Sequence, residues 1–275
     1  MKHYLLILLL TLPLYGQDVS FTLQTWATVS KMETAQTGVG IRRARIRGKF
    51  GEGNVSAFVQ YGMASGKLHD ARVDVKFDKY TVRVGRFVVP GNQSGGQTSH
   101  TALDFCERSI VGRMYSIEMD RPDHRSYGVS VIGNYGVFNY EVMASNPENI
   151  KPYNINHSVV NPSTKLDYMA YIKTGNLSSG VHYNSVSITG YAYLENDRFR
   201  GKVDVVHTDL SKGYRVLAFW KLSRFEIGAQ YETWNELRDI TAGANFTLNA
   251  KSKLKVAATF MEKQTIFHVM LQLKS

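Results

Sequence analysis

An alternation of period two runs through almost the whole chain after its first 16 residues. Apolar and aromatic residues occupy one parity, whereas small, polar and charged residues occupy the other. Clear examples are ARVDVKF (71–77) and FHVMLQL (267–273). This pattern is typical of β-strands with one apolar and one polar face. Beyond the first 16 residues no stretch of about 18 apolar residues occurs, so a helical membrane protein is excluded.

Short turn motifs divide the alternating runs. Some of the other connections are long, notably 90–126 and 146–163. Short turns at one end and longer loops at the other are typical of outer-membrane β-barrels, and the count is about 16 antiparallel strands with both chain ends on the short-turn side. Residues 177–194 leave the count open by two, because they fit either one long strand or a tight hairpin. The turn motifs lie at 51–54, 78–79, 134–136, 175–179, 195–197, 222–224 and 249–252.

A soluble β-sandwich also has strands of alternating polarity, so it is the main alternative to a membrane barrel. The chain contains 16 Tyr and 13 Phe, and many of them lie near predicted strand ends, where a barrel places its interfacial aromatic girdles. The polar faces carry too much charge for the interior of a sandwich. In lipid every backbone donor and acceptor needs a partner within the protein, which strands achieve only in a closed barrel. The sequence therefore predicts an all-β, transmembrane antiparallel β-barrel.

The first residues, MKHYLLILLLTLPLYGQ, combine a short basic start with an apolar run over Leu5–Leu14. This pattern predicts a secretory signal peptide, residues 1–16, that is cleaved near Gly16. Residues 17–275 then form the barrel domain of an exported protein, located in the bacterial outer membrane and surrounded by its lipid. The single cysteine, Cys106, excludes an intrachain disulfide.

The chain is strongly basic, with 33 Lys and Arg against 23 Asp and Glu and a formal net charge of +10. Such an excess favours anionic partners and says nothing directly about the fold. Nucleic acid is the poorest of these partners for an exported protein. Anionic lipid and small anions both remain open.

Positive charge is most concentrated in GIRRARIRGKF (40–50). If the apolar parity of this strand faces lipid, the other parity directs Arg43, Arg45, Arg47 and Lys49 into the lumen. Residues two apart on one strand face are separated by about 7 Å, so the guanidinium groups form a ladder along which an anion can pass between donors. Guanidinium stays charged at physiological pH and binds oxyanions through paired donors. Rows of Arg and Lys are a known device of anion and phosphate pores.

Arg42 falls on the lipid-facing parity of the same strand. An Arg that faces lipid at the midplane costs about 2–4 kcal/mol. Three explanations are therefore open: Arg42 lies at the membrane interface, lies on a β-bulge, or is covered by a neighbouring subunit.

Neighbouring strands add lumen-parity cations. The alternative role for these cations is to pair with Asp70 and Asp74 and brace the barrel wall. This alternative applies most directly to Arg72, which has an acid two residues away on either side. The added cations are Arg72, Lys76 and Arg83, with Arg86 just beyond.

Four elements within residues 40–111 resemble the phosphate-selective porin O and P family of outer-membrane porins. The resemblance implies a barrel of 16 strands, a homotrimer, and passage of phosphate or a related anion along lumen arginines. It also implies a constriction loop folded inward, which here would be the connection 90–126. The matching elements are the pair Arg42–Arg43, DARVDVKF (70–77), VRVGRFVVP (82–90) and DFCERSIV (104–111), in this order.

Within that loop, SHTALDFCERSIV (99–111) is expected to form a short helix that bears Glu107 and Arg108. Two roles are open for Arg108: it lines the constriction, or it pairs with Glu107 or a wall acid and holds the loop down. The chain is shorter than is usual in that family, which implies trimmed loops.

Two other classes of barrel compete with a porin. For a barrel enzyme the sequence offers no nucleophile elbow and no metal-ligand spacing, its histidines are dispersed, and Cys106 is better explained as a packing residue. We therefore expect no catalytic activity, no cofactor and no metal. A non-conducting binding or adhesion barrel would work through loops such as 146–163, which carries no recognisable motif. A less selective anion porin also stays open, because the pore radius is not encoded in any pattern.

Overall fold

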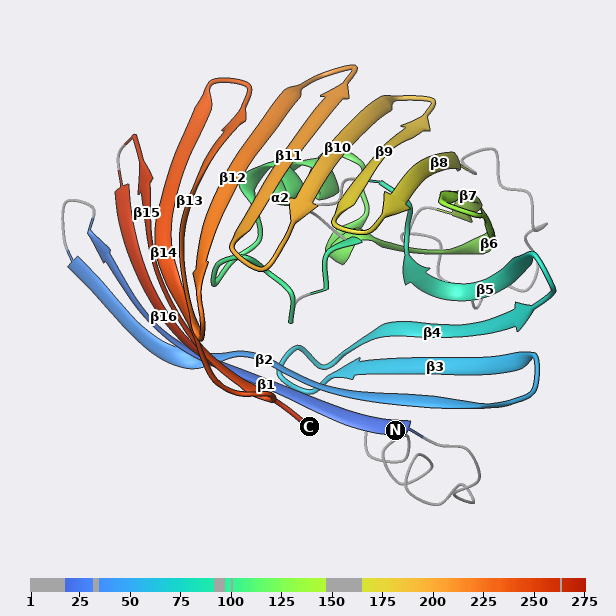
Figure 1. Ribbon diagram of the computed structural model, residues 1–275, viewed down its shortest axis with the longest axis horizontal. Helices are drawn as coiled ribbons and strands as arrows, with labels where there is room; N and C mark the ends of the chain where they lie inside the picture. Colours follow the sequence, from blue (N-terminus) through green and yellow to red (C-terminus); the bar gives the residue numbers. More distant parts are fainter. Residues whose placement is uncertain (1–17, 32–34, 92–96, 100, 147–164, 263) are drawn as a thin grey trace.

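The computed structural model describes residues 18–275 except 32–34, 92–96, 100, 147–164 and 263. Sixteen antiparallel strands form a closed barrel in which β1 pairs with both β2 and β16 (Figure 1). The strands are β1 (Asp18–Lys31), β2 (Ala35–Glu52), β3 (Val55–Gly62), β4 (Lys67–Lys76), β5 (Tyr80–Val88), β6 (Arg125–Tyr135), β7 (Phe138–Asn146), β8 (Lys165–Thr174), β9 (Leu177–Asn184), β10 (Ser187–Glu195), β11 (Phe199–Thr208), β12 (Lys212–Leu222), β13 (Phe225–Trp234), β14 (Leu237–Asn249), β15 (Ser252–Met261) and β16 (Gln264–Lys274).

The predicted fold class is confirmed, and so is the strand count. Residues 177–194 form the hairpin of β9 and β10, which removes the alternative of one long strand. The predicted signal peptide and the predicted surface loop 146–163 lie almost entirely outside the described residues. Among the helices that are described, none has the length and apolar character needed to cross a bilayer.

The alternation of the sequence becomes an apolar outer surface and a polar interior. On β12, Val216 and Trp220 are 50% and 62% exposed, whereas Arg215 is 4% exposed. Buried side chains on other strands include Gln24 of β1 and Asp167 of β8. A soluble protein has the opposite distribution, so this outer surface matches a barrel that is surrounded by lipid.

The C-terminus closes against the first strand on the barrel wall, at the end where the predicted short turns lie. The C-terminal Ser275 closes against β1, because its Oγ accepts a hydrogen bond from the Phe21 N–H at 2.7 Å and its own N–H donates to the Phe21 carbonyl. Figure 1 shows the beginning of β1 and the end of β16 on the same side. At the opposite end several described connections are also short, including 63–66, 185–186 and 209–211. Among the described connections, long loops at that end are therefore fewer than the outer-membrane barrel pattern predicts.

Gly85 of β5 is required by close contact between neighbouring strands. Its φ is +127°, and an added Cβ would lie 2.2 Å from the Ala71 carbonyl oxygen of β4. We expect Gly85→Ala to destabilise the barrel by about 1–3 kcal/mol, measured as a lower temperature for loss of compact mobility on semi-native gels. Gly40→Ala is the matched control, because nothing lies within 4 Å of its added Cβ. Equal unfolding temperatures for the two variants would contradict this account.

The connection between β5 and β6 runs inside the ring of strands (Figure 1). We call residues 97–99 and 101–124 of this connection the inward segment. It contains helix α2 (Ile110–Glu118) and the short 3-10 helix η2 (Pro122–His124). Two apolar clusters attach it to the wall of β11–β16. One cluster joins Phe105 and Cys106 to Leu217, Phe219, Ala257 and Met270, and the other joins Ile110, Val111, Tyr115 and Met119 to Val206 and Trp234.

The helix predicted within 99–111 is wrong in its position. Helix α2 begins at Ile110, and Ser109 is its N-cap residue, whose Oγ accepts a hydrogen bond from the Gly112 N–H at 3.2 Å. Serine satisfies an unpaired N–H at a helix start, which explains why the helix begins there. Glu107 and Arg108 therefore precede the helix and lie in an irregular stretch of the inward segment.

Candidate functional site

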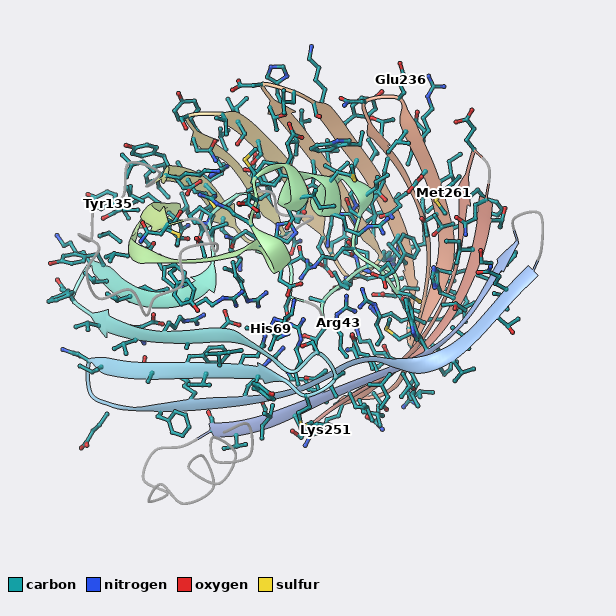
Figure 2. The ribbon with its side chains drawn as sticks, turned by 180° about the vertical axis from the view of Figure 1, so that it is seen from behind. Arg43, His69, Tyr135, Glu236, Lys251 and Met261 are labelled. Carbon is teal, nitrogen blue, oxygen red and sulfur yellow. The ribbon has the colours of Figure 1, made fainter. Side chains whose placement is uncertain are left out.

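A cavity of about 570 Å³ lies inside the barrel between β2, the β3–β4 turn and the inward segment. Figure 2 shows Arg43 and His69, two of its lining residues, within the ring of strands, whereas Glu236 and Tyr135 lie at the outer edge of the view. Seven cationic side chains and two carboxylates line this cavity. The cations are Arg42, Arg43, Arg45, Lys67, Arg108, Arg113 and Arg125, and the carboxylates are Glu107 and Asp123.

Arg42 reaches the interior because β2 contains a β-bulge. Gln24 of β1 pairs with Arg43 and the next residue, Thr25, pairs with Ile41, so Arg42 is the extra residue. Its Nε and Nη2 donate to the two carboxylate oxygens of Glu107 at 2.5 and 3.0 Å. Of the three explanations for its parity, the bulge is the one observed. A subunit contact is not needed to account for this arginine.

The next three arginines of β2 share the lumen side. Arg43 donates to the Gln24 side-chain oxygen at 3.0 Å and lies 3.9 Å from a Glu107 oxygen. Arg45 is buried and lines the cavity. Arg47 donates to the Gln60 side-chain oxygen at 2.7 Å. Uncharged amides are thus among the partners of Arg43 and Arg47, and an amide does not neutralise the charge of a guanidinium.

Arg72 and Arg83 lie apart from the cavity and share one acid. Arg83 donates to both oxygens of Asp74 at 2.7 and 3.2 Å, and the Arg72 Nε lies 3.4 Å from an Asp74 oxygen. Each guanidinium also covers an aromatic ring, Phe58 for Arg72 and Phe87 for Arg83. This geometry is the one that the wall-bracing alternative describes.

Lys76 is found with Lys49 and Asp18 at a second cavity of about 190 Å³. The predicted ladder is therefore not continuous along the wall of β2–β5. Four of the predicted residues line the main cavity, and Arg47, the Asp74 group and Lys76 lie outside its lining.

Both oxygens of Glu107 accept hydrogen bonds from Arg42, and Arg108 lines the same cavity. Its Nη1 donates to the Thr98 carbonyl at 2.9 Å, within the inward segment. Burial, and then the charges of Arg43 and Arg125, lower the pKa of Arg108 to about 10. The guanidinium therefore remains charged at neutral pH.

Both carboxylates of the cavity are held in their ionised form. Burial alone would raise the pKa of Glu107, but the hydrogen bond and charge of Arg42, followed by the charge of Arg43, lower it below its ordinary value. The neighbouring His69, whose Nδ1 lies 3.4 Å from an Asp123 oxygen, is the main cause that holds the pKa of Asp123 well below its usual range. The cavity nevertheless keeps a clear excess of positive groups.

The pattern of the sequence missed Arg125, Arg113, Lys67 and His124. Arg125 is the first residue of β6, and its Nη2 donates to Asp70 of β4 at 3.0 Å, across 55 positions of sequence. No local periodicity contains such a contact. Burial, followed by the charges of Arg108 and Arg125, lowers the pKa of His124 to about 3, so this imidazole is neutral.

Within the described part of the chain, no group of three or more His, Cys, Asp or Glu side chains is placed to hold a metal ion. Cys106 packs in an apolar cluster, and burial raises the pKa of its thiol to about 12. A protonated, buried thiol is a poor nucleophile.

The solved structures that resemble this barrel include bacterial porins. An anion-selective porin from Comamonas acidovorans superposes with a TM-score of 0.69 at 15% identity, covering 94% of this chain and 99% of that one. The Salmonella typhi OmpF complex with daunomycin gives a TM-score of 0.72 at 12% identity, covering 94% and 97%. The chain has the porin fold. Neither the family models nor the curated proteins contain a match to its sequence.

In this porin fold the cationic cavity lies within the ring of strands. A loop-deletion mutant of OmpT, an outer membrane protein of Vibrio cholerae, has the same architecture, with a TM-score of 0.65 at 10% identity over 94% of this chain and 99% of that one. Identities of 10–15% establish the fold alone. The narrower resemblance to phosphate-selective porins is therefore a matter for the proposed function.

Proposed function

We propose that this chain is an anion-selective porin of the bacterial outer membrane that passes phosphate or related oxyanions along its lumen arginines. The observation that carries the proposal is the composition of the 570 Å³ cavity, where seven cationic side chains face two carboxylates. A basic lumen with low-dielectric walls concentrates anions and excludes cations.

The arginines of the main cavity differ in how each can bind a passing anion. Arg42 is fixed by Glu107 and stacks over the Trp26 ring, with its guanidinium carbon 5.0 Å from the ring centre. Arg43, Arg45 and Arg108 complete the same cavity and offer planar donors to an oxyanion. Glu107 offsets part of their charge, so that an anion binds weakly enough to leave again.

Beyond the main cavity the same wall continues with Arg47, then the Arg72 and Arg83 pair, and then Lys49 and Lys76. An anion that leaves Arg45 would meet Arg47 about 7 Å further along the strand. The inward segment crosses the lumen and contacts this wall through Glu107, so it narrows the path of an anion through the barrel. The constriction by this segment is part of the proposal.

The phosphate preference, the outer-membrane location and the homotrimer are proposed on the sequence resemblance and the signal peptide pattern. The bulge removes one argument for the trimer, because Arg42 pairs with Glu107 inside its own barrel. The exposed apolar outer surface supports contact with lipid. Small anions and lipid are thus the proposed partners, and nucleic acid is not.

The proposal is tested with the purified protein in planar bilayers. We expect single-channel currents with a reversal potential in a KCl gradient that indicates preference for chloride, and we expect phosphate at low concentration to block the chloride current. Absence of current would favour a non-conducting adhesion barrel. Anion preference without phosphate block would favour the less selective anion porin.

A further inference from the structure

A second cationic cluster lies on the wall opposite the arginine row, and a residue of the inward segment occupies it. The carboxylate of Asp104 accepts hydrogen bonds from Lys202 Nζ at 2.9 and 3.1 Å and from Arg215 Nη2 at 2.6 Å. Arg200 Nε lies 3.4 Å from the same carboxylate. Asp104 is only 5% exposed. Three cations from β11 and β12 thus surround one carboxylate.

These cations are held in place by contacts that do not involve Asp104. Arg215 also donates to Gln230 at 3.1 Å and to Asp204 at 3.3 Å. Arg200 donates to Glu226 at 3.0 Å. Their positions are therefore set by the barrel wall itself, independently of the inward segment.

Aromatic rings contact two of these three cations. The guanidinium carbon of Arg200 lies 4.8 Å from the centre of the Phe219 ring, and the ammonium of Lys202 lies 4.9 Å from that of Tyr193. Such cation–π contacts hold long side chains in one orientation. The cluster is consequently a preformed set of donors for an anion with two oxygens.

The backbone on either side of Asp104 is anchored at the same place. Asn245 Nδ2 donates to the Asp104 carbonyl at 2.9 Å, and Lys255 Nζ donates to the carbonyl of Leu103. The next residue, Phe105, packs against Phe219 with 4.9 Å between ring centres. The carboxylate is therefore the charged centre of the attachment between the inward segment and the far wall.

We propose that β11 and β12 carry a binding site for a small carboxylate, and that Asp104 is its built-in occupant, which positions the inward segment across the lumen. Asp104 is a positioning residue in this account, and its effect on conduction rests on the proposed porin function. Burial alone would raise the pKa of Asp104, but Arg215, Lys202 and Arg200 hold it well below its usual range. The occupant is accordingly an anion at any pH near neutrality.

If the site recognises a carboxylate rather than one particular residue, a free carboxylate will replace a missing side chain. Asp104→Ala removes the occupant and leaves space of about the size of formate. Cys106, the single cysteine of the chain and 1% exposed, reports whether the inward segment stays attached. This readout does not depend on whether the barrel conducts ions.

The experiment measures the rate at which Cys106 in the detergent-solubilised, folded barrel reacts with a neutral maleimide. We expect Asp104→Ala to react at least about tenfold faster than the wild-type protein, because removal of one member of a buried charge cluster is strongly destabilising. Formate is expected to return the rate to near the wild-type value. Formamide, which has a similar shape and no charge, is expected to have no effect.

Two further variants keep the test decisive. Asp104→Asn is expected to react faster as well, but without rescue by formate, because the amide still fills the space. If Asp104→Ala yields no folded barrel, Lys202→Met tests the same site from the wall, with faster labelling and no rescue. Asp78→Ala, in an exposed turn, is the control and should label like the wild-type protein.

Wild-type labelling rates in both Asp104→Ala and Lys202→Met would overturn the proposal, and so would equal rescue by formate and formamide. Conductance adds a second readout. The single-channel current of Asp104→Ala is expected to be noisier than that of the wild-type protein, and formate is expected to reduce this noise. A wild-type barrel that passes no current refutes the porin function alone, because the labelling result stands separately.

Discussion

The double substitution Arg43→Glu with Arg45→Glu is expected to abolish or reverse the anion preference of the channel. Both side chains are at most 9% exposed and line the cationic cavity. The change converts two of its seven cations into carboxylates, beside Glu107 and Asp123. An anion in the cavity would then lose its attraction to the wall of β2, and a cation would gain a favourable site.

The size of this effect follows from Coulomb's law. Each Arg→Glu change alters the local charge by two units, which at ~10 Å and water-like dielectric shifts the energy of a monovalent ion by ~0.8 kcal/mol. Two such changes shift it by ~1.6 kcal/mol, upwards for an anion and downwards for a cation. The ratio of anion to cation permeability therefore changes by ~3.2 kcal/mol, or roughly 200-fold. The reversal potential in a KCl gradient measures this ratio directly.

The matched control carries the same change of net charge at the barrel surface. Lys212 and Arg238 are both exposed, so Lys212→Glu with Arg238→Glu should leave the reversal potential close to that of the wild-type protein. An unchanged preference in the Arg43→Glu, Arg45→Glu channel would show that the arginine row does not select the ions.

The barrel was predictable because its main determinant is local. Apolar and polar residues alternate along each run. The shared face of Arg43, Arg45 and Arg47 therefore follows from their spacing alone. The closure of β1 against β16 then follows from an even number of strands. These are features that a pattern of period two contains. The hairpin at 177–194 was left open by that pattern and is decided by the pairing of β9 with β10.

The site was less predictable, because its contacts join residues far apart in sequence. The bulge at Arg42 depends on the register between β1 and β2, which alternation does not specify. The inward segment is attached by Asp104 and Phe105 to lumen residues of β11 and β12, where Leu217 and Phe219 are apolar on a face expected to be polar. Lys202 lies more than 90 positions from Asp104 in the sequence, so no local pattern predicts their contact.

The helix start illustrates a different limit. Residues 99–111 contain good helix formers, but their side chains are engaged by the wall and by Arg42, and Ser109 caps the helix that follows. Tertiary contacts therefore displaced the helix from the position that local preference indicated. Glu107 lies outside the regular helix, and its carboxylate accepts hydrogen bonds from Arg42 of β2.

Loss of the buried ion pair between Arg121 and Asp167 should be the most destabilising single change in the barrel. Asp167 is 0% exposed and accepts hydrogen bonds from Arg121 Nη1 at 2.9 Å and Nη2 at 2.6 Å. The Asn184 amide donates to the same carboxylate at 3.0 Å, and the His182 ring nitrogen lies at 3.0 Å. Asp167 thus attaches the end of the inward segment to β8 and β9.

We expect Asp167→Ala to lower the free energy of unfolding by about 3–5 kcal/mol, because it leaves the guanidinium of Arg121 buried without its carboxylate. Urea titration of the barrel in lipid vesicles, followed by tryptophan fluorescence, measures the loss. Asp197→Ala, in an exposed turn, should change it by less than about 0.5 kcal/mol.

The decisive comparison is a double variant that removes both charges. Arg121→Met with Asp167→Leu replaces the pair by apolar groups, and buried pairs replaced in this way often lose little stability or none. If the double variant is more stable than Asp167→Ala, the cost arises from the uncompensated charge and not from the lost packing. Equal loss in both would mean that His182 and Asn184, which the double variant also leaves without their acceptor, account for the effect, and that Arg121 contributes little to the attachment of the inward segment.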